Sequence, residues 1–381
     1  MLRGADPPTV RRALDTGDAL PGTDGFAGAV DGTLVRDVLG RQPLFYEERS
    51  RDAESVDAAD GWAFDPASLS APTRLPAGYA NDATGTRRVW SLPDPAPATD
   101  QQKAIVAVRE AVERSVRAVD ADGLAVAFSG GVDSATVAAG VPEAPCYVVG
   151  FESANDIERA RSSAATLARD LRVVELTHDD VERAVPEVVA ATGRLDAMDV
   201  SIALTFFLVA ERVAADGFDR LAVGQGVDEL FGGYAKIADP QQHSHADAET
   251  TRGARRDTLL NLPTQLERDV LAIRATGVEP VAPLLHDRVV RAALPLPGEL
   301  LATTDKRKIA FRRATDELLP ASIRRADKNA AQYGSYVARE LDRLARQAGF
   351  KRRMDDHVRK YVVSLVEDAG VDVPQIQQPI E

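Results

Sequence analysis

The sequence is poor in several residue types, and each shortage excludes a class of protein. Its 381 residues include a single cysteine, Cys146, so no disulfide can form within the chain. No apolar run approaches the ~20 residues that cross a membrane, and residues 1–6 lack a signal-peptide core. The five histidines show no metal-ligand spacing with cysteine or acidic partners. We therefore expect a cytoplasmic protein with neither a membrane segment nor a His/Cys metal centre.

Lysine is also scarce, because only seven of the 46 basic residues are lysine. Aspartate is abundant, and the formal net charge of -13 disfavours binding to nucleic acid or to an anionic membrane. This Asp-rich, Lys-poor composition is similar to that of halophilic proteins, in which salt screens the repulsion between like charges. Each lysine that is present is accordingly a stronger candidate for a specific role.

The chain length predicts two or three domains, at roughly one per ~150 residues. In residues 1–97, short apolar segments alternate with Gly, Pro and Asp turns, which predicts a small, mostly β domain. Residues 93–97, Pro-Asp-Pro-Ala-Pro, are typical of a stiff linker. We place the domain boundary there, and a second domain over 98–381 begins with a helix capped by Asp100.

Strand and helix patterns alternate from Leu124 onward. Strands are expected over 124–128, 148–151, 172–176 and 221–223, and helices over 156–170, 179–192 and 201–216. This alternation predicts an α/β fold in which helices cover a doubly wound parallel sheet. After Leu260 the pattern is mostly helical.

The strongest motif is Ser-Gly-Gly-Val-Asp-Ser over residues 129–134, between a buried-looking strand and a helix. The glycines let the backbone approach an anion, and the helix N-terminus offers unpaired N–H groups. Asp133 would repel a bare phosphate, but it becomes a ligand if Mg²⁺ lies between them. No Walker-type lysine follows. The motif predicts a site for a magnesium-bound nucleotide, and the alternative is a capped, glycine-rich turn.

A second strand, glycine turn and helix start occupies residues 221–234, with Asp228 two residues after Gly226. Loops at the carboxyl ends of neighbouring strands meet at one crevice of a doubly wound sheet, so Asp228 is expected beside Asp133. Two carboxylates there would hold one Mg²⁺. Taken alone, this stretch is also compatible with an ordinary capped helix.

These motifs carry a family resemblance. Residues 129–134 match the pyrophosphate-binding loop (PP-loop) of ATP pyrophosphatases, which cleave ATP between the α and β phosphates. Residues 224–234 resemble the Gly-Glu-Gly-x-Asp-Glu-(Leu/Val)-Phe-Gly-Gly-Tyr segment of asparagine synthetase and its β-lactam synthetase relatives, with Gln225 replacing the family's Glu. Weaker similarities extend over about residues 100–335. The resemblance implies an adenine nucleotide α-hydrolase-like fold and an AMP-forming carbon–nitrogen ligase.

The resemblance also implies roles for individual residues. Asp133 and Asp228 would hold Mg²⁺, while Lys328 would offset negative charge on the departing pyrophosphate, with Lys306 and Lys308 as alternatives. Glu279 would take the proton from the attacking amine. The implied nucleotide-binding residues are Ser129, Gly130, Gly131, Asp133, Ser134, Val149, Gly150 and Gly226.

The implied cofactors are ATP and Mg²⁺. The implied substrates are a carboxylate, aspartate by default, and ammonia or an amine. A homo-oligomer is compatible with this assignment, whereas a nucleic-acid partner is disfavoured by the net charge of -13.

The first domain resembles the glutaminase domain of the same family in residues 35–46 and 75–78. In the family that domain uses the cysteine after the initiator methionine as its nucleophile, but position 2 is Leu2 here and Cys146 belongs to the second domain. We therefore interpret residues 1–97 as a shortened, inactive glutaminase-like domain. Nitrogen would then come from free ammonia or from an amine on the substrate, because no glutamyl thioester can form.

Two other functions stay open at this point. Enzymes that modify tRNA or another small molecule by adenylation use the same loop, and a basic patch would favour that alternative. A non-catalytic nucleotide-binding relative is the second alternative, and the presence of Asp133, Asp228 and Lys328 argues against it.

Overall fold

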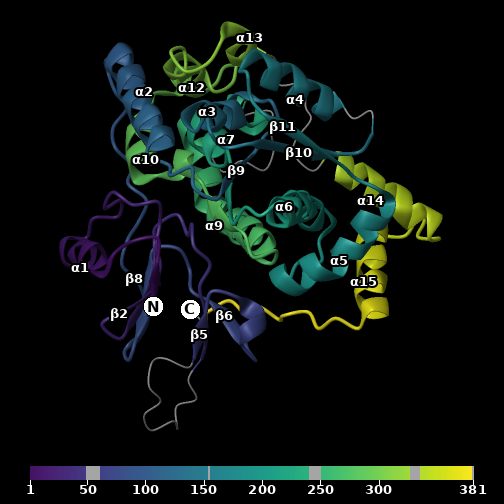
Figure 1. The fold of residues 1–381 in the computed structure, drawn as a ribbon. Helices are drawn as coiled ribbons and strands as arrows, with labels where there is room; N and C mark the ends of the chain where they lie inside the picture. The colour runs from purple at the N-terminus through teal and green to yellow at the C-terminus, as the bar shows by residue number, and fades with distance from the viewer. Residues whose placement is uncertain (49–60, 153–154, 240–249, 327–334, 380–381) are drawn as a thin grey trace.

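The computed structural model describes residues 1–48, 61–152, 155–239, 250–326 and 335–379. These residues form small antiparallel sheets near the N-terminus and a larger part built on a parallel sheet (Figure 1). None of the described helices is both long and apolar enough to cross a membrane.

The N-terminal residues form the small, mostly β part that the sequence predicts. Its two sheets have the strand orders β1-β2-β3-β7-β8 and β5-β4-β6, and every pairing is antiparallel. The strands are β1 (Leu2–Arg3), β2 (Ala27–Val30), β3 (Thr33–Arg36), β4 (Phe45–Glu47), β5 (Trp62–Ala63), β6 (Pro72–Arg74), β7 (Tyr79–Asp82) and β8 (Gly85–Arg88). The sequence analysis missed helix α1 (Pro7–Thr16), which is capped by the carboxylate of Asp6, an acceptor for the backbone amide of Thr9.

The predicted parallel sheet is confirmed, with the strand order β11-β10-β9-β12-β13. Its strands are β9 (Leu124–Ala127), β10 (Cys146–Gly150), β11 (Leu171–Glu175), β12 (Arg220–Ala222) and β13 (Glu279–Val281). The short edge strand β13 was not predicted, because it contains Pro280 and has three residues. The chain adds β10 and β11 on one side of β9 and then β12 on the other. The loops after β9 and β12 therefore lie at the switch point, where open α/β sheets bind ligands.

Side chains of β9 alternate between two hydrophobic cores on opposite faces of the sheet. Leu124 and Val126 pack in one core, while Ala125 and Ala127 pack in the other. The first face carries α2 (Gln101–Arg117), α3 (Val132–Gly140) and α4 (Asn155–Thr166), and the second carries α5 (His178–Thr192), α6 (Ala197–Ala215), α14 (Ser335–Gln347) and α15 (His357–Ala369). Because both faces are covered, the strand is an unbroken apolar run.

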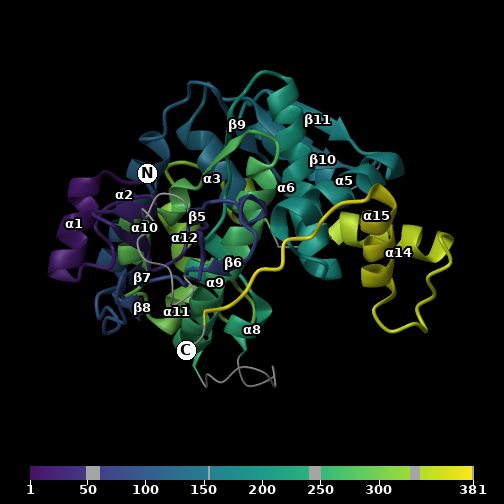
Figure 2. The same ribbon diagram turned by 90° about the horizontal axis from the view of Figure 1, so that it is seen from below.

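The remaining chain is mostly helical, as predicted. Its short elements are α7 (Val227–Phe231), α8 (Ala235–Ala238), α10 (Asp287–Ala293), α11 (Gly298–Leu301), α12 (Ile309–Ala314), α13 (Ala321–Arg324) and the 3₁₀ turn Pro283–Leu285. A further 3₁₀ turn, Pro66–Ser68, lies in the N-terminal part. The long helix α9 (Thr251–Arg274) packs against α5, α6 and α7. After α15 the chain runs back to the N-terminal sheets (Figure 2), where Gln377 exchanges backbone hydrogen bonds with Pro72 and Arg74.

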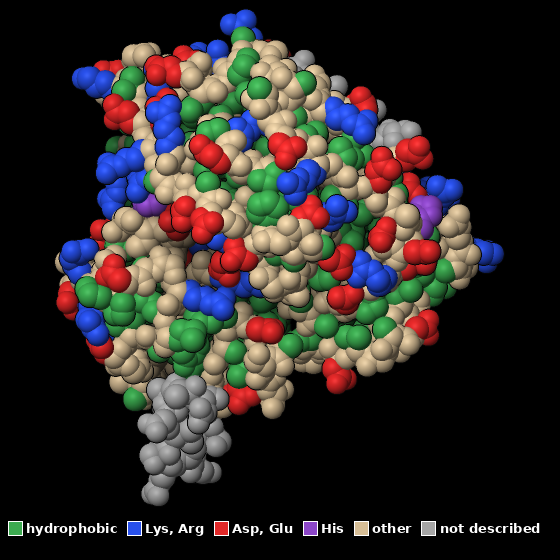
Figure 3. Space-filling view, in the orientation of Figure 1, with side chains coloured by type: hydrophobic (Ala, Val, Ile, Leu, Met, Phe, Trp, Pro, Cys, Tyr) green, Lys and Arg blue, Asp and Glu red, His purple; other side chains and the backbone are tan. Residues whose placement is uncertain are grey.

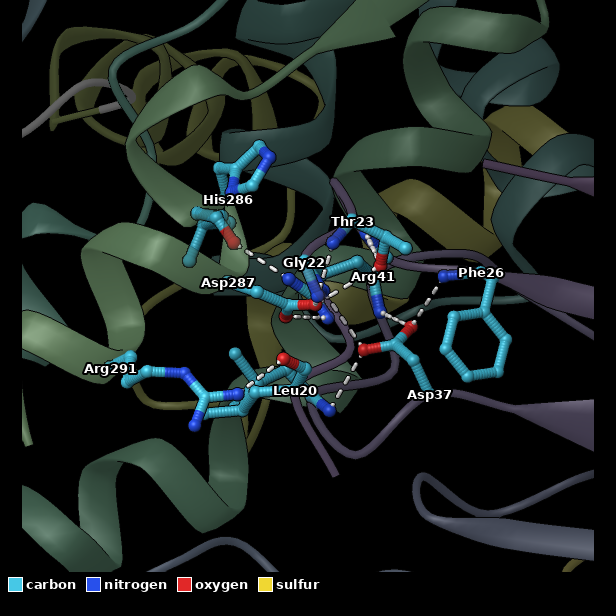
Figure 4. Close-up of polar contacts among 12 residues, drawn as sticks. Leu20, Gly22, Thr23, Phe26, Asp37, Arg41, His286, Asp287 and Arg291 are labelled. Carbon is cyan, nitrogen blue, oxygen red and sulfur yellow. Dashed lines mark hydrogen bonds and ion pairs between the residues drawn. The ribbon is translucent and has the colours of Figure 1, made fainter. Parts of the chain in front are cut away.

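A buried ionic contact joins the N-terminal part to the larger part (Figure 4). The guanidinium of Arg41 lies 2.9 Å from Asp37 and 2.8 Å from Asp287, and it donates to the carbonyl of Leu285. The other carboxylate oxygen of Asp287 accepts from the backbone amide of Thr23 at 2.8 Å. All three charged side chains are at most 3% exposed. The two parts therefore share a buried boundary, and their division at residue 97 stays a prediction.

Candidate active site

The loop between β9 and α3 brings backbone N–H groups to the carboxyl end of the sheet. Gly130 has φ 71°, and a Cβ there would lie 2.8 Å from the carbonyl oxygen of Arg159. Gly131 precedes α3 without a side-chain capping bond, so the first amides of this helix point to where an anion would bind. The hydroxyl of Ser134 accepts from the backbone amide of Ser129 at 3.2 Å, which holds the loop in shape.

The loop between β12 and α7 packs directly on this first loop. A Cβ on Gly224 would lie 2.9 Å from the backbone of both Asp133 and Ser134. Only glycine allows this approach without displacing the phosphate loop. Asp228 follows in the first turn of α7, so the two acidic side chains named by the motifs come from adjoining loops.

Asp133 and Asp228 meet at the side chain of Lys308, and we call these three residues the cavity cluster. The Nζ atom of Lys308 lies 2.6 Å from Asp133 Oδ2 and 2.8 Å from Asp228 Oδ1. Burial by itself would lower the pKa of the Lys308 ammonium, but the two carboxylates outweigh burial and raise it. Lys308, which the sequence analysis ranked below Lys328, therefore stays charged where the two loops meet.

The two carboxylates suit the Mg²⁺ that the phosphate-loop chemistry implies. Both carboxylates contact one cation, the Lys308 ammonium, so they are close enough to share a ligand. Nucleotide-bound Mg²⁺ typically takes one or two protein carboxylates beside phosphate oxygens. Within the described ranges, no group of three or more His, Cys, Asp or Glu side chains could hold a metal by itself. A magnesium ion here would therefore need the phosphates as additional ligands.

A cavity of about 530 Å³ opens over the two loops. The predicted nucleotide-binding and metal-binding residues all lie in its wall: Ser129, Gly130, Gly131, Asp133, Ser134, Val149, Gly150, Gly226 and Asp228. The end of β10 forms one side of the cavity and the cavity cluster lies beside the phosphate loop. The volume is in the range typical of pockets for small molecules and cofactors.

A second polar group in the cavity wall comes from α9, α6 and the loop after β12. The amide nitrogen of Gln225 donates to Asp269 Oδ2 at 2.5 Å, and Arg268 Nε donates to Asp269 Oδ1 at 2.7 Å. Arg268 also contacts Asp199 of α6 at 2.6 Å. Burial raises the pKa of Asp269 even though Arg268 opposes the shift. We call Asp199, Gln225, Arg268 and Asp269 the α9 polar group.

The carboxylate of Glu229 accepts a hydrogen bond from the Tyr234 hydroxyl in the same cavity wall. Burial, followed by the neighbouring charge of Asp228, raises the pKa of Glu229. The sequence analysis gave no role to Glu229, Tyr234 or the α9 polar group. A usable signal was present in the adjacent charges 267–269, which stand between the apolar residues Leu266 and 270–273, because charged residues are rarely buried without a partner.

Glu279 does not lie in the cavity wall. It is the first residue of β13, pairs with Arg220 of β12 across the sheet, and therefore lies at the amino edge of the sheet, opposite the phosphate loop. Its carboxylate contacts Arg274 and is 48% exposed. The predicted role of Glu279 as a base thus lacks geometric support, because the resemblance located the residue in sequence but not its end of the strand. Lys328 lies outside the described residues, so its predicted role is not tested.

Cys146 lies in β10 and is fully buried. Burial raises the pKa of its thiol to about 11, so the thiolate that a nucleophile requires is scarce near neutral pH. Cys146 is therefore poorly suited to act as a nucleophile.

The family model for asparagine synthase matches residues 107–261 and 239–364 of this chain. The putative glutamine-hydrolyzing asparagine synthetase 1 of Methanocaldococcus jannaschii is 28% identical over 297 residues, which cover 68% of this chain and 54% of the relative. Glutamine-hydrolyzing asparagine synthetase B of Escherichia coli is 24% identical over 239 residues, covering 57% of this chain and 42% of the relative. The chain thus spans about half the length of these relatives.

Among solved structures, the chain is similar to an ammonia-dependent NAD synthetase from Campylobacter jejuni. The TM-score is 0.30 and the identity 12%, and the match covers 72% of this chain and 96% of that one.

Proposed function

The chain belongs to the asparagine synthase family, and on this premise we propose that it is an ATP-dependent synthetase that joins a carboxylate to ammonia or an amine. The carboxylate is activated as an acyl-adenylate, with aspartate as the default substrate. AMP and pyrophosphate are the nucleotide products.

The observation that carries the proposal is the meeting of two strand-end loops at the cavity cluster. Asp133 and Asp228 lie within 2.6–2.8 Å of Lys308 Nζ, directly beside the N-terminus of α3. A polyphosphate at that helix terminus would find N–H donors and an ammonium group together. A site for a neutral ligand would need neither the two carboxylates nor the ammonium group.

In the first half-reaction an oxygen of the substrate carboxylate attacks the α-phosphorus, and the bond to the pyrophosphate oxygen breaks. Negative charge grows on that oxygen, and the first amides of α3 with the ammonium of Lys308 would stabilise it. Mg²⁺ held by Asp133 and Asp228 would supply further electrostatic stabilisation when it is bound. We propose that Lys328, which lies outside the described residues, also offsets negative charge on the departing pyrophosphate.

We further propose that residues 1–97 have a structural role, in which they pack against the larger part of the chain, and that they are not a glutaminase. This segment contains no cysteine, and the chain's one thiol is buried in β10. Free ammonia or an amine is then the nitrogen source. A nucleic-acid substrate receives little support, because acidic and basic side chains are interspersed over the face shown in Figure 3 and the net charge is -13.

Exchange of labelled pyrophosphate into ATP tests this function across a panel of carboxylates, with product analysis by chromatography. Assays in high salt suit the acidic composition. We expect exchange that depends on one class of carboxylate, with AMP as the nucleotide product when ammonia or an amine is added. ADP as the main stoichiometric product would overturn the assignment. Hydrolysis of glutamine by the pure protein would overturn the proposal for residues 1–97.

A further inference from the structure

The α9 polar group places a buried carboxylate in the cavity that phosphate chemistry does not use. Asp269 lies in the cavity wall, and its side chain is 7% exposed. It belongs to α9, whereas the cavity cluster comes from the loops after β9 and β12 and from Lys308. A carboxylate so sheltered from water is held in one position by its partners, which is a requirement for proton transfer in a defined direction.

The partners of Asp269 hold it without neutralising the group as a whole. Gln225 donates to Asp269 without carrying a charge. Arg268 contacts both Asp269 and Asp199. Arg194 lies 3.7 Å from Asp199. Asp199 faces Asp269 and, with burial, favours the protonated form of its carboxyl group. The Tyr234 hydroxyl is a further titratable group near enough to respond to Asp269. A carboxylate in these surroundings accepts a proton more readily than an exposed one.

Gln225 connects this carboxylate to the phosphate loop. It lies in the loop after β12, three positions before Asp228, and its amide nitrogen is 2.5 Å from Asp269 Oδ2. The same amide carries a carbonyl oxygen, which can accept an N–H from an incoming nitrogen. The acceptor atoms of Gln225 and Asp269 therefore belong to residues that line the same cavity as the phosphate loop.

We propose that Asp269 is the base that takes a proton from the nitrogen nucleophile, with Gln225 and Arg268 as its positioning residues. The proposal rests on the proposed function and assigns to Asp269 the step that the family resemblance gave to Glu279. As the nitrogen attacks the acyl carbon, a C–N bond forms and the bond from that carbon to the AMP oxygen breaks. AMP leaves with the electron pair, and the proton from nitrogen moves to the carboxylate of Asp269.

The test separates the two half-reactions. Pyrophosphate exchange reports adenylate formation, and amide formation reports both steps. In Asp269→Asn we expect exchange within about threefold of wild type and amide formation slower by ~10²–10⁴, the usual loss for a missing general base. Glu279→Gln should keep both activities, since that carboxylate lies at the other edge of the sheet. Normal amide formation in Asp269→Asn, or amide formation lost in Glu279→Gln alone, would overturn the proposal.

Gln225→Glu gives a second test that does not depend on removing the buried carboxylate. It places a second carboxylate against Asp269, and two carboxylates that share one site raise the pKa of one of them. The acid limb of the pH profile for amide formation should move up by about one unit or more, while exchange keeps its pH profile. An unmoved acid limb would contradict the role of Asp269.

These outcomes also separate this proposal from the proposed function. If the wild-type protein shows no carboxylate-dependent exchange with any substrate, the synthetase assignment is wrong, and so is the proposed role of Asp269 as a base. If the wild-type protein shows both exchange and amide formation, and Asp269→Asn keeps both in full, only the proposed role of Asp269 is wrong.

Discussion

Two charge clusters of the molecule differ in which sign of charge predominates. In the cavity cluster, two carboxylates contact Lys308 and are 23% and 24% exposed to the cavity. In what we call the sealed cluster, Glu267 is 1% exposed and contacts Arg36 of β3, Arg74 of β6 and Arg194. The carboxylates of the first are open to a ligand in the cavity, whereas the carboxylate of the second is enclosed by its arginine partners.

This difference shows what the N-terminal part contributes to the larger part. Arg36 and Arg74 both come from the antiparallel sheets, and Glu267 lies next to Arg268 on α9. These contacts hold α9 against the N-terminal strands at Glu267, two residues before Asp269. A segment without catalytic residues can in this way set the position of a carboxylate in the cavity.

The largest expected effect is on folding stability, in the sealed cluster. Glu267→Gln leaves buried guanidinium groups without their counter-charge, and removal of one partner of a buried ion pair costs about 3–5 kcal/mol. We expect a drop of this size in the free energy of unfolding, measured by urea titration. Glu279→Gln is the matched control, because the Glu279 carboxylate is half exposed and its pair with Arg274 should contribute ~1 kcal/mol or less. Equal losses in the two variants would mean that the sealed cluster contributes no more than a surface pair.

The next effect is on adenylate formation, in the cavity cluster. Lys308→Met removes a donor aimed at the departing pyrophosphate, and we expect carboxylate-dependent exchange to fall by ~10²–10³, equivalent to ~2.7–4 kcal/mol. Lys306→Met is the control, because that side chain is exposed two residues away. If exchange persists in Lys308→Met, the phosphate role passes to Lys328 or to the loop and metal alone.

Much of the cavity was predictable because its motifs are local. Glycine spacing after an apolar strand predicts the loop over residues 129–134, and the rule for ligand sites in open α/β sheets predicts Asp228 beside Asp133. Lys308 and Asp269 were not located in this way, since their partners are 175 and 44 residues away in sequence. Long-range contacts of this kind depend on how α9 and α12 pack, and periodicity carries no information about that.

The N-terminal part shows the same limit. Alternating apolar segments predicted short strands, yet α1 and the burial of Arg36 and Arg41 were missed. A buried arginine has the same sequence signature as an exposed one, and only its carbonyl and carboxylate partners reveal it. The misplaced role of Glu279 has a related cause, because a motif gives the order of residues but not the end of the strand on which one lies.

A smaller effect concerns the pH dependence of stability, and the two buried carboxylates of α9 should show opposite slopes. Burial alone would raise the pKa of Glu267, but Arg36, Arg74 and Arg194 outweigh it and lower the pKa. Its stabilisation is present above the unfolded value, about 4.3, and is lost as pH falls through the folded value.

Asp269 has a raised pKa, so its favourable contribution is present at low pH and is lost as pH rises through the folded value. Between about pH 3 and pH 7, the deficit of Glu267→Gln relative to wild type should grow with pH, and that of Asp269→Asn should shrink. Urea midpoints at several pH values measure both slopes. Parallel slopes would show that the two carboxylates do not differ in their charge surroundings.

The smallest expected effect is on the free energy of unfolding, from an ion-pair group on the solvent-exposed surface. It gives a reference value for the effect of the sealed cluster. Arg183 of α5 contacts Glu187 at 3.0 Å and Glu211 at 2.7 Å, and all three side chains are 40–52% exposed. Water and salt screen such a group, so Arg183→Gln should change the free energy of unfolding by ~0.2–1 kcal/mol in low salt. In high salt the change should vanish, because the screening length falls to about 3 Å at 1 M. Glu267→Gln should keep its full deficit under the same conditions, since the Glu267 carboxylate is only 1% exposed to the salt solution. Urea titration of both variants with and without salt measures this. A salt-sensitive deficit in Glu267→Gln would mean that solvent reaches the contacts between Glu267 and the N-terminal strands. The N-terminal sheets would then pack on α9 too loosely to position Asp269.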